Sequence, residues 1–165
     1  MRLTTKGRYA VTAMMDLVIH QNTGPVTLQE IAASQDISLS YLEQLFGALR
    51  RAGLVKGTRG PGGGYRLAKP ADDITIARII AAVDEKVDAT RCGGDSDCQA
   101  GERCLSHELW AHLSQKLYEF LDNITLGEVA RWPQVLEVAA RQDAKLGRGH
   151  EMPRTGLKGV QVVQR

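Results

Sequence analysis

The sequence has no long hydrophobic run, and this lack argues against a membrane-spanning helix. In 165 residues no apolar stretch approaches the roughly 18 residues that such a helix needs. The N-terminal stretch MRLTTKGRYAV carries basic side chains, but it has no apolar segment that ends in a small-residue cleavage site. No secretory signal peptide is indicated. We therefore expect a cytoplasmic protein that makes no contact with a membrane.

Cysteine is scarce and confined to one place. The three cysteines fall between Cys92 and Cys104, and the rest of the chain has none. An odd number of thiols does not suit a disulfide framework. In a cytosolic protein, clustered thiols more often indicate metal binding or redox chemistry.

The sequence also lacks the patterns of a catalytic site. It shows no nucleophile paired with a base, no paired carboxylates and no nucleotide-binding loop. The segment RGPGGG has the glycines of a phosphate loop, but it lacks the Lys-Ser/Thr of a P-loop and lies between expected strands. An enzyme is not expected. The length suits one domain of DNA-binding size with an added element, and no internal repeat is present.

Positive charge is unevenly distributed along the chain. The net charge is only +2, yet residues 1–80 hold ten Lys and Arg against six Asp and Glu, whereas residues 81–165 hold eleven against thirteen. Six basic residues and no acidic residue lie between Glu43 and Asp72: Arg50, Arg51, Lys56, Arg59, Arg66 and Lys69. Such a block is typical of phosphate binding. A solvated basic face would be the better interpretation if no motif stood there.

The first third of the chain has the pattern of three helices. Residues 6–20 place apolar side chains at helical spacing, namely Ala10, Ala13, Met14, Leu17 and Val18. Residues 22–25 break this helix. A capping box at residues 27–30 predicts a second helix, and a turn is expected at 35–37. A further capping box, from Ser40 to Glu43, predicts the start of a third helix that Gly53 ends. The last two helices form a helix-turn-helix.

The next segment has the pattern of a β-hairpin. Residues 54–58 and 64–68 are expected strands, and the connection at 59–63 is rich in glycine and proline. Thr75 is expected to cap a helix that turns Ile76, Ile79, Ile80 and Val83 inward. The fold class is therefore mainly α, a winged helix-turn-helix with a two-stranded wing.

The second half contains a long amphipathic helix. Residues 88–103 are polar and irregular, and a helix is expected from about 106 to 123. Its apolar stripe comprises Leu109, Leu113, Leu117, Phe120, Leu121 and Ile124. The stripe suits packing either on the winged domain or on a second copy, and dimerisation is favoured because helix-turn-helix proteins commonly read two-fold DNA.

The end of the chain has weaker patterns. A short helix is expected from Thr125 to about Pro133, with one or two further turns at 135–141. From Gly147 onward a disordered tail is expected. Four segments result: a DNA-binding domain (1–84), a metal-binding loop (85–105), a dimerisation helix with short C-terminal helices (106–141) and a tail (142–165).

Four potential metal ligands follow the pattern Cys92-x5-Cys98-x5-Cys104-x2-His107. Zinc sites usually use Cys-x2-4-Cys knuckles, and none is present. The longer, glycine-containing gaps form a wide loop that suits a larger group. Cys104 and His107 stand three apart near the start of the long helix, so both are expected on one side of it. Chemistry alone leaves an iron–sulfur cluster open against zinc or a redox thiol. His20, His112 and His150 have no cysteine nearby and receive no role.

Candidate DNA contacts lie on the third helix and the wing. Those on or near the helix are Ser38, Ser40, Tyr41, Glu43, Gln44 and Arg50. Gln pairs with adenine and Glu accepts from cytosine in the major groove, although Glu43 also suits a capping role for Ser40. Arg59, followed by Gly60 and a stretch with few side chains, suits a narrow minor groove. Lys56 suits a phosphate contact.

Five segments in order carry a family resemblance: LTTKGRYA, ISLSYLEQLF, VKGTRGPGGGYRL, AVDEKVDATRC with the Cys/His spacing, and LYEFLDNITLGEV. Together they resemble the IscR family of iron–sulfur cluster regulators over about residues 1–140. The resemblance implies a homodimeric winged-helix transcription regulator that binds a double-stranded DNA operator. It also implies a [2Fe-2S] cluster on Cys92, Cys98, Cys104 and His107.

In that family the cluster-loaded protein represses the operon for iron–sulfur cluster assembly, and some members also act without it. Activation or repression of other promoters and an assembly machinery that donates the cluster are further expectations. Related nitrite- and iron-sensing regulators share the winged helix but space their cysteines differently and lack the histidine. The alternatives from other classes are a zinc-stabilised DNA-binding protein and an electron-transfer or cluster-carrier enzyme.

Overall fold

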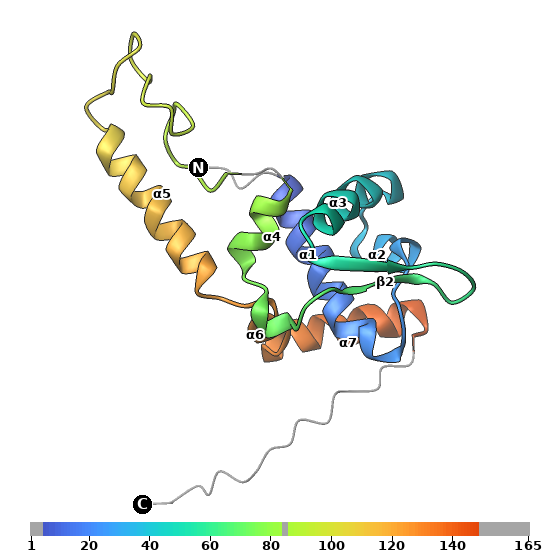
Figure 1. The fold of residues 1–165 in the computed structure, drawn as a ribbon. Coiled ribbons are helices and arrows are strands. Elements are labelled where there is room, and N and C mark those ends of the chain that lie inside the picture. Colours follow the sequence, from blue (N-terminus) through green and yellow to red (C-terminus); the bar gives the residue numbers. More distant parts are fainter. Residues whose placement is uncertain (1–4, 84–85, 149–165) are drawn as a thin grey trace, which may run out of the picture.

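The computed structural model describes residues 5–83 and 86–148, and these are mainly helical (Figure 1). The winged-helix fold class is confirmed. The helices are α1 (Thr5–His20), α2 (Leu28–Gln35), α3 (Leu39–Arg51), α4 (Ile76–Ala82), α5 (His107–Asp122), α6 (Leu126–Ala130) and α7 (Pro133–Leu146), the strands are β1 (Val55–Thr58) and β2 (Gly64–Leu67), and the short 3-10 turns are η1 (Gln21–Thr23) and η2 (Ala71–Asp73). No helix in this part of the chain has the length and apolarity of a membrane span.

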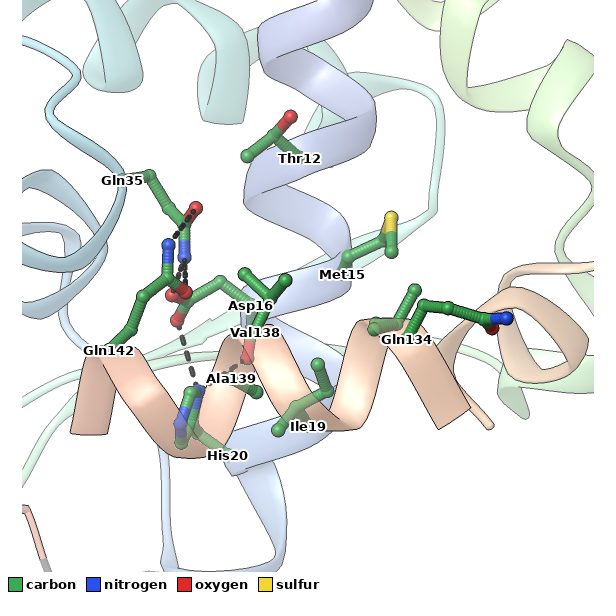
Figure 2. A pocket seen from close by; sticks show the side chains of 11 residues that line it. Thr12, Met15, Asp16, Ile19, His20, Gln35, Gln134, Val138, Ala139 and Gln142 are labelled. Carbon is green, nitrogen blue, oxygen red and sulfur yellow. Dashed lines mark hydrogen bonds and ion pairs between the residues drawn. The ribbon is translucent and has the colours of Figure 1, made fainter. Parts of the chain in front are cut away.

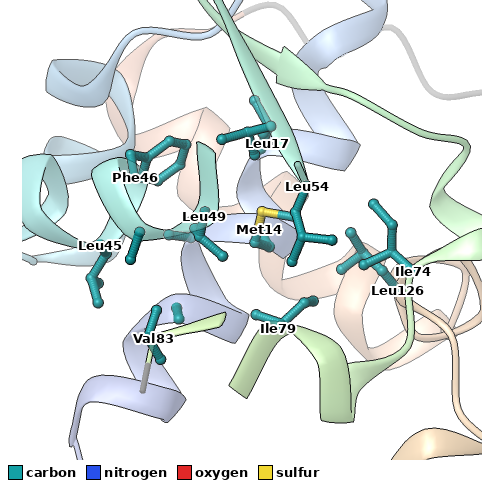
Figure 3. Packing of buried hydrophobic residues seen from close by; sticks show 14 of the residues in the cluster. Met14, Leu17, Leu45, Phe46, Leu49, Leu54, Ile74, Ile79, Val83 and Leu126 are labelled. Carbon is teal, nitrogen blue, oxygen red and sulfur yellow. The ribbon is translucent and has the colours of Figure 1, made fainter. Parts of the chain in front are cut away.

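The hydrophobic core lies among α1, α3, α4, α6 and the base of the wing (Figure 3). The apolar face predicted for the first helix is buried, with Ala10, Ala13, Met14 and Leu17 fully inside. Phe46 and Leu49 of α3 meet this face, and Leu126 of α6 closes the core from the C-terminal side. Burial of these side chains contributes most of the stability of the winged domain.

Helix α2 begins at the capping box that the sequence predicts. Thr27 accepts a hydrogen bond from the Glu30 amide at 3.2 Å, and the Thr27 amide donates to Glu30 Oε2 at 2.7 Å. The helix ends at Asp36, whose φ of 53° is left-handed. This turn leads directly into α3 and sets the relative positions of the two helices.

The second predicted capping box, at Ser40, is wrong. Helix α3 begins at Leu39, its N-terminal cap is Ser38, and no side chain caps it. The carbonyl of Ser38 already accepts the Leu42 amide at 3.1 Å, so Ser40 lies inside the first turn. Glu43 therefore has no capping role. Gly53 ends the helix as predicted: at φ 69° it lets the Leu54 amide reach the Leu49 carbonyl at 3.0 Å.

The two strands of the wing pair antiparallel, with Val55 opposite Leu67 and Thr58 opposite Gly64. A bridge between Tyr65 and Val26 fastens the wing to the chain just before α2, with amide–carbonyl distances of 2.7 and 2.9 Å. Gly64 has φ 150°, and a Cβ there would lie 2.6 Å from the Val26 carbonyl oxygen. Only glycine allows this close approach, so Gly64 fixes the wing against α2.

Helix α5 stands apart from the winged domain and carries the cluster loop, defined here as residues 86–106, at its far end (Figure 1). It is anchored by its C-terminal end, where Ile124 accepts a hydrogen bond from the Ile76 amide at 3.0 Å and Asp122 accepts one from Thr75 at 2.8 Å. Much of the predicted stripe is exposed, with Leu109 and Phe120 at 64% and 62%. Leu121 and Ile124 pack on the core.

Helix α7 is longer than the one or two turns predicted, and it continues to Leu146, into the segment assigned to the tail. Figure 2 shows it crossing the C-terminal half of α1, where Asp16 and His20 lie. His20, which the sequence left without a role, joins buried Asp16 on its own helix to buried Asp143 on α7. Gln35 of α2 bonds to Gln142 at 3.1 Å. The rest of the predicted tail, residues 149–165, lies outside the described residues.

Candidate DNA-binding face and cluster loop

A polar groove of about 570 Å³ lies between α3, the start of α2 and the wing. Of the DNA contacts predicted from the sequence, Glu43, Arg50, Arg59 and Gly60 line it. Ser38, Ser40, Gln44 and Lys56 are exposed but lie outside its lining. The groove thus joins the exposed face of α3 to the tip of the wing, which is the arrangement that a winged helix offers to DNA.

Helix α3 exposes Ser40, Glu43 and Gln44 on one face, while Leu42, Leu45 and Phe46 are buried. The Glu43 side chain makes no hydrogen bond or ion pair with any described residue, so its carboxylate is available to a ligand. Tyr41 differs from these residues because it is half-buried and its ring meets Tyr9 edge-on at 5.9 Å. Tyr41 therefore has a packing role in addition to any contact with DNA.

The basic block divides into two groups. Arg50 and Arg59 are exposed on the groove, and Lys56 is exposed on β1. Arg66 instead donates to the Gln21 carbonyl at 3.0 Å and is half-buried. Arg66 thus supports the base of the wing, and the cationic surface offered to phosphates is smaller than the sequence count suggests.

The start of α2 was not among the DNA contacts predicted from the sequence. Thr27, Leu28 and Gln29 line the same groove as Glu43 and Arg59. The capping box had marked a helix N-terminus here, and the Thr27 and Glu30 amides are already satisfied within it. The wing brings this terminus into the groove through the bridge between Val26 and Tyr65.

In the cluster loop, two thiols converge on one imidazole. Nδ1 of His107 lies 3.3 Å from Sγ of Cys98 and 3.6 Å from Sγ of Cys92, and the potential ligand atoms of all three residues lie within 4.8 Å of one another. His107 is 5% exposed, and its Nε2 lies 3.3 Å from the Ser96 hydroxyl. A hydrogen bond with Thr90 lowers the pKa of Cys92 to about 6, which favours the thiolate that binds metals.

Cys104 lies beside Cys98, and its amide donates to Cys98 Sγ at 3.4 Å. It precedes α5, which begins at His107, and its carbonyl accepts the His107 amide at 3.0 Å. Its Sγ lies 3.7 Å from the Ser106 hydroxyl and is not part of the close group of three ligand atoms. Cys104 nevertheless lines one cavity of about 500 Å³ together with Cys98 and His107.

The donor set fits an iron–sulfur group. Thiolates and imidazole are soft or borderline ligands that suit iron–sulfur clusters and zinc. The cavity beside the ligands is larger than one ion requires, and Cys98, Cys104 and His107 all line it. The arrangement can hold a group with more than one metal atom.

The comparisons with known proteins agree with this fold. Residues 3–131 match the family described as Rrf2, iron-dependent transcriptional regulator. The chain is 60% identical over 146 residues to the HTH-type transcriptional regulator IscR of Photobacterium profundum, covering 88% of this chain and 85% of the relative. It is 58% identical over 148 residues to the IscR of Pectobacterium carotovorum, covering 90% of each protein. The resemblance seen in the sequence is confirmed.

Solved structures give the same result. A structure titled T. potens IscR is 33% identical with a TM-score of 0.64, covering 94% of each chain. The structure of CymR, the global cysteine regulator of B. subtilis, is 36% identical with a TM-score of 0.67, covering 79% of this chain and 96% of that one. The chain belongs to the Rrf2 family of iron-dependent transcriptional regulators, and it is a winged-helix DNA-binding regulator and not an enzyme.

Proposed function

We propose that this regulator is a cytoplasmic homodimer that holds a [2Fe-2S] cluster on Cys92, Cys98, Cys104 and His107. With the cluster it represses the operon for iron–sulfur cluster assembly, and it regulates other promoters with or without it. The proposal depends above all on the convergence of Cys92, Cys98 and buried His107 within 4.8 Å. The assembly machinery is the proposed donor of the cluster.

DNA binding is proposed for the groove between α3 and the wing. The exposed side chains Ser40, Glu43 and Gln44 lie in the first turns of α3, the part of a recognition helix that reaches base edges. Arg59 at the wing would enter the minor groove, where a narrow width raises the negative potential. Ser38, Tyr41, Arg50, Lys56 and Gly60 complete the proposed interface.

The second copy is proposed to pack on α5. In the single chain its apolar residues stay 38–64% exposed, namely Leu109, Trp110, Leu113, Tyr118 and Phe120. Their burial would offset the cost of association. Dimerisation then sets the spacing of two winged domains on a two-fold operator.

The proposed switch depends on where the ligands lie. Cys92, Cys98 and Cys104 are on the loop after α4, while His107 is the first residue of α5. When bound, the [2Fe-2S] group would link the loop to the helix. This link would form only when iron and sulfide are available. The four ligands would then hold the winged domain and the dimer helix in one arrangement. Such a link changes DNA choice only if one class of site favours that arrangement.

Glu43 is the proposed discriminator between operators. Its carboxylate accepts a hydrogen bond from cytosine but is repelled by base acceptors and phosphates. The structure removes its alternative role as a helix cap, because α3 begins at Leu39. The cluster-free protein would reject some operators because of Glu43, and the cluster would relieve this rejection.

The test starts with protein purified without air. Its absorption spectrum and its iron and sulfide contents should show one [2Fe-2S] cluster per chain, whereas a colourless protein with zinc alone would contradict the proposal. Affinity for a panel of palindromic sites at one salt concentration is then compared for loaded protein, Cys92→Ala, and Cys92→Ala with Glu43→Ala. Equal binding by the first two proteins rules out a cluster switch. If they differ and Glu43→Ala restores nothing, Glu43 is not the discriminator.

A further inference from the structure

We infer that Ser114 and Asp88 form a clasp that fastens the start of the cluster loop to α5 and so positions Cys92 against His107. The residues lie outside the proposed ligand set. The inference deepens the proposed function and rests on it for the identity of the bound group. The clasp itself can be tested without any bound metal.

The contacts of the clasp meet at the Ser114 hydroxyl. The Ala89 amide donates to Ser114 Oγ at 2.8 Å, and Asp88 Oδ1 lies 3.4 Å from the same atom. The Thr90 amide donates to Asp88 Oδ1 at 2.6 Å. A hydroxyl has a single hydrogen, and Ser114 donates it to the Trp110 carbonyl at 2.8 Å, the shorter of its two acceptor distances, while a lone pair accepts from the Ala89 amide. Ser114 thus holds Ala89, which lies 25 positions earlier in the chain, and Asp88 beside it holds the Thr90 amide.

The clasp reaches Cys92 through one residue. Thr90, fixed by Asp88, accepts the Gly94 amide at 2.8 Å, and Cys92 Sγ lies 3.6 Å from the same Thr90 hydroxyl. The Thr90 hydroxyl therefore contacts both the Cys92 thiol and the Gly94 amide, and it fixes the segment that carries Cys92. If Thr90 moves, Cys92 loses its approach to Nδ1 of His107 at 3.6 Å.

Helix α5 presents the clasp and the ligand on one face. Ser114 follows His107 by about two helical turns, since a turn takes 3.6 residues. Trp110 lies between them, lines the cavity, and donates from Nε1 to Ser106 Oγ at 3.1 Å. Ser106 in turn contacts Cys104. The same face therefore supports both ends of the loop, while Leu109, Leu113 and Phe120 form the separate apolar stripe.

The clasp should reduce the conformational entropy of a glycine-containing loop. The loop contains Gly93, Gly94 and Gly101, all at positive φ, and ordering such a chain around a bound group costs conformational entropy. Contacts that order the start of the loop before binding reduce the entropy that is lost when the group binds. Loss of Ser114 Oγ should therefore weaken retention of the bound group without removing any ligand.

The experiment compares Ser114→Ala with Ser114→Thr, which keeps a hydroxyl, and with Gln115→Ala. Gln115 is a matched control because it is exposed on the same helix and its hydrogen bond goes to Glu119. The first measurement is hydrogen exchange of the Ala89 and Thr90 amides in full-length, chelator-stripped protein. Ser114→Ala should speed this exchange about three- to tenfold, as expected for one lost hydrogen bond. The Thr variant should restore it, and Gln115→Ala should leave it unchanged.

The second measurement concerns the loaded protein. Ser114→Ala should shift the visible circular dichroism of the cluster and speed loss of its absorbance to a chelator without air, again about three- to tenfold. Unchanged amide exchange in Ser114→Ala would overturn the clasp. Faster exchange with an unchanged spectrum and unchanged loss would overturn its role in positioning Cys92. If the wild-type protein holds no [2Fe-2S] cluster, the proposed function fails, while the amide exchange still decides whether the clasp exists.

Discussion

Nε2 of His20 lies 3.0 Å from Oδ1 of Asp143, and this contact joins α1 to α7 across 123 positions of the chain. Asp143 is 1% exposed. A buried carboxylate needs a partner that offsets its loss of hydration. Removal of either partner leaves a buried polar or charged group without that interaction and destabilises the fold. The pair therefore fixes the last helix on the winged domain.

Replacing Asp143 by Ala should lower the free energy of unfolding by about 2 kcal/mol, because the imidazole loses a buried partner. His20 keeps its contact with Asp16, which limits the loss. Urea unfolding monitored by circular dichroism measures the change. Glu137→Ala on the exposed side of the same helix is the control and should change stability little. Equal stability of the two variants would show that the pair contributes nothing.

The same cluster predicts a dependence of stability on pH. The hydrogen bond with Asp16 raises the pKa of His20 to about 9 from its ordinary 6.5. Because the folded state binds the proton more tightly, this contribution is fully present below pH 6.5 and is lost as the pH rises through 9. For a half-buried imidazole we expect about 1–2 kcal/mol. His20→Gln should flatten the fall in stability between pH 6.5 and 9.5, whereas His112→Gln, on exposed α5, should not. Parallel pH profiles for wild type and His20→Gln would refute the assignment.

Substitution of the proposed ligands should separate thiol from imidazole roles. Serine at Cys92, Cys98 or Cys104 should abolish the cluster, since a hydroxyl is a poor ligand for a soft metal site. His107→Ala should leave a weaker or spectrally shifted site. Visible absorption of protein purified without air is the measurement, and His112→Ala is the control on the same helix. An unaltered spectrum and cluster stability in His107→Ala would exclude His107 as a ligand.

Arg59 and Lys56 should contribute differently to DNA binding. Arg59→Ala should weaken binding most at operators with an A·T-rich stretch under the wing, by about 1–3 kcal/mol. Lys56→Ala and Arg50→Ala should weaken binding about equally for all sequences and reduce the salt slope by about 1 each. Binding titrations at several salt concentrations distinguish the two effects. Equal losses on every sequence for Arg59→Ala would make it a phosphate contact.

The apolar stripe of α5 should control the oligomeric state. Phe120→Glu places a charge at a side chain that is 62% exposed in a single chain, so the fold should tolerate it while a dimer interface should not. Sedimentation should show a shift from dimer to monomer, with helical circular dichroism preserved. Gln115→Glu, at an exposed position outside the stripe, should remain dimeric. A dimer that survives Phe120→Glu unchanged would place the interface elsewhere.

The sequence by itself determined the elements whose signals are local. Thr27, Thr75 and Thr125 each accept the amide three residues later, and the helices start after them. Gly53 and the wing glycines Gly60 and Gly62 act through their own backbone angles, so they can be recognised without knowledge of their neighbours. The spacing of the cysteines and His107 likewise indicated one site, because residues near in sequence can meet within a loop.

Tertiary structure decided what depends on distant partners. Ser40 has the local pattern of a cap, but the Ser38 carbonyl accepts the Leu42 amide and starts the helix earlier. Helix α7 has a weak sequence pattern because it buries little besides Ala139 and Asp143. The partner of Asp143 is His20 on the first helix. The Ser114 clasp and the place of the α2 N-terminus in the groove depend in the same way on packing. A short stretch of sequence contains only one of the two residues in such a contact. The contact forms, and contributes to stability, only when the chain is folded.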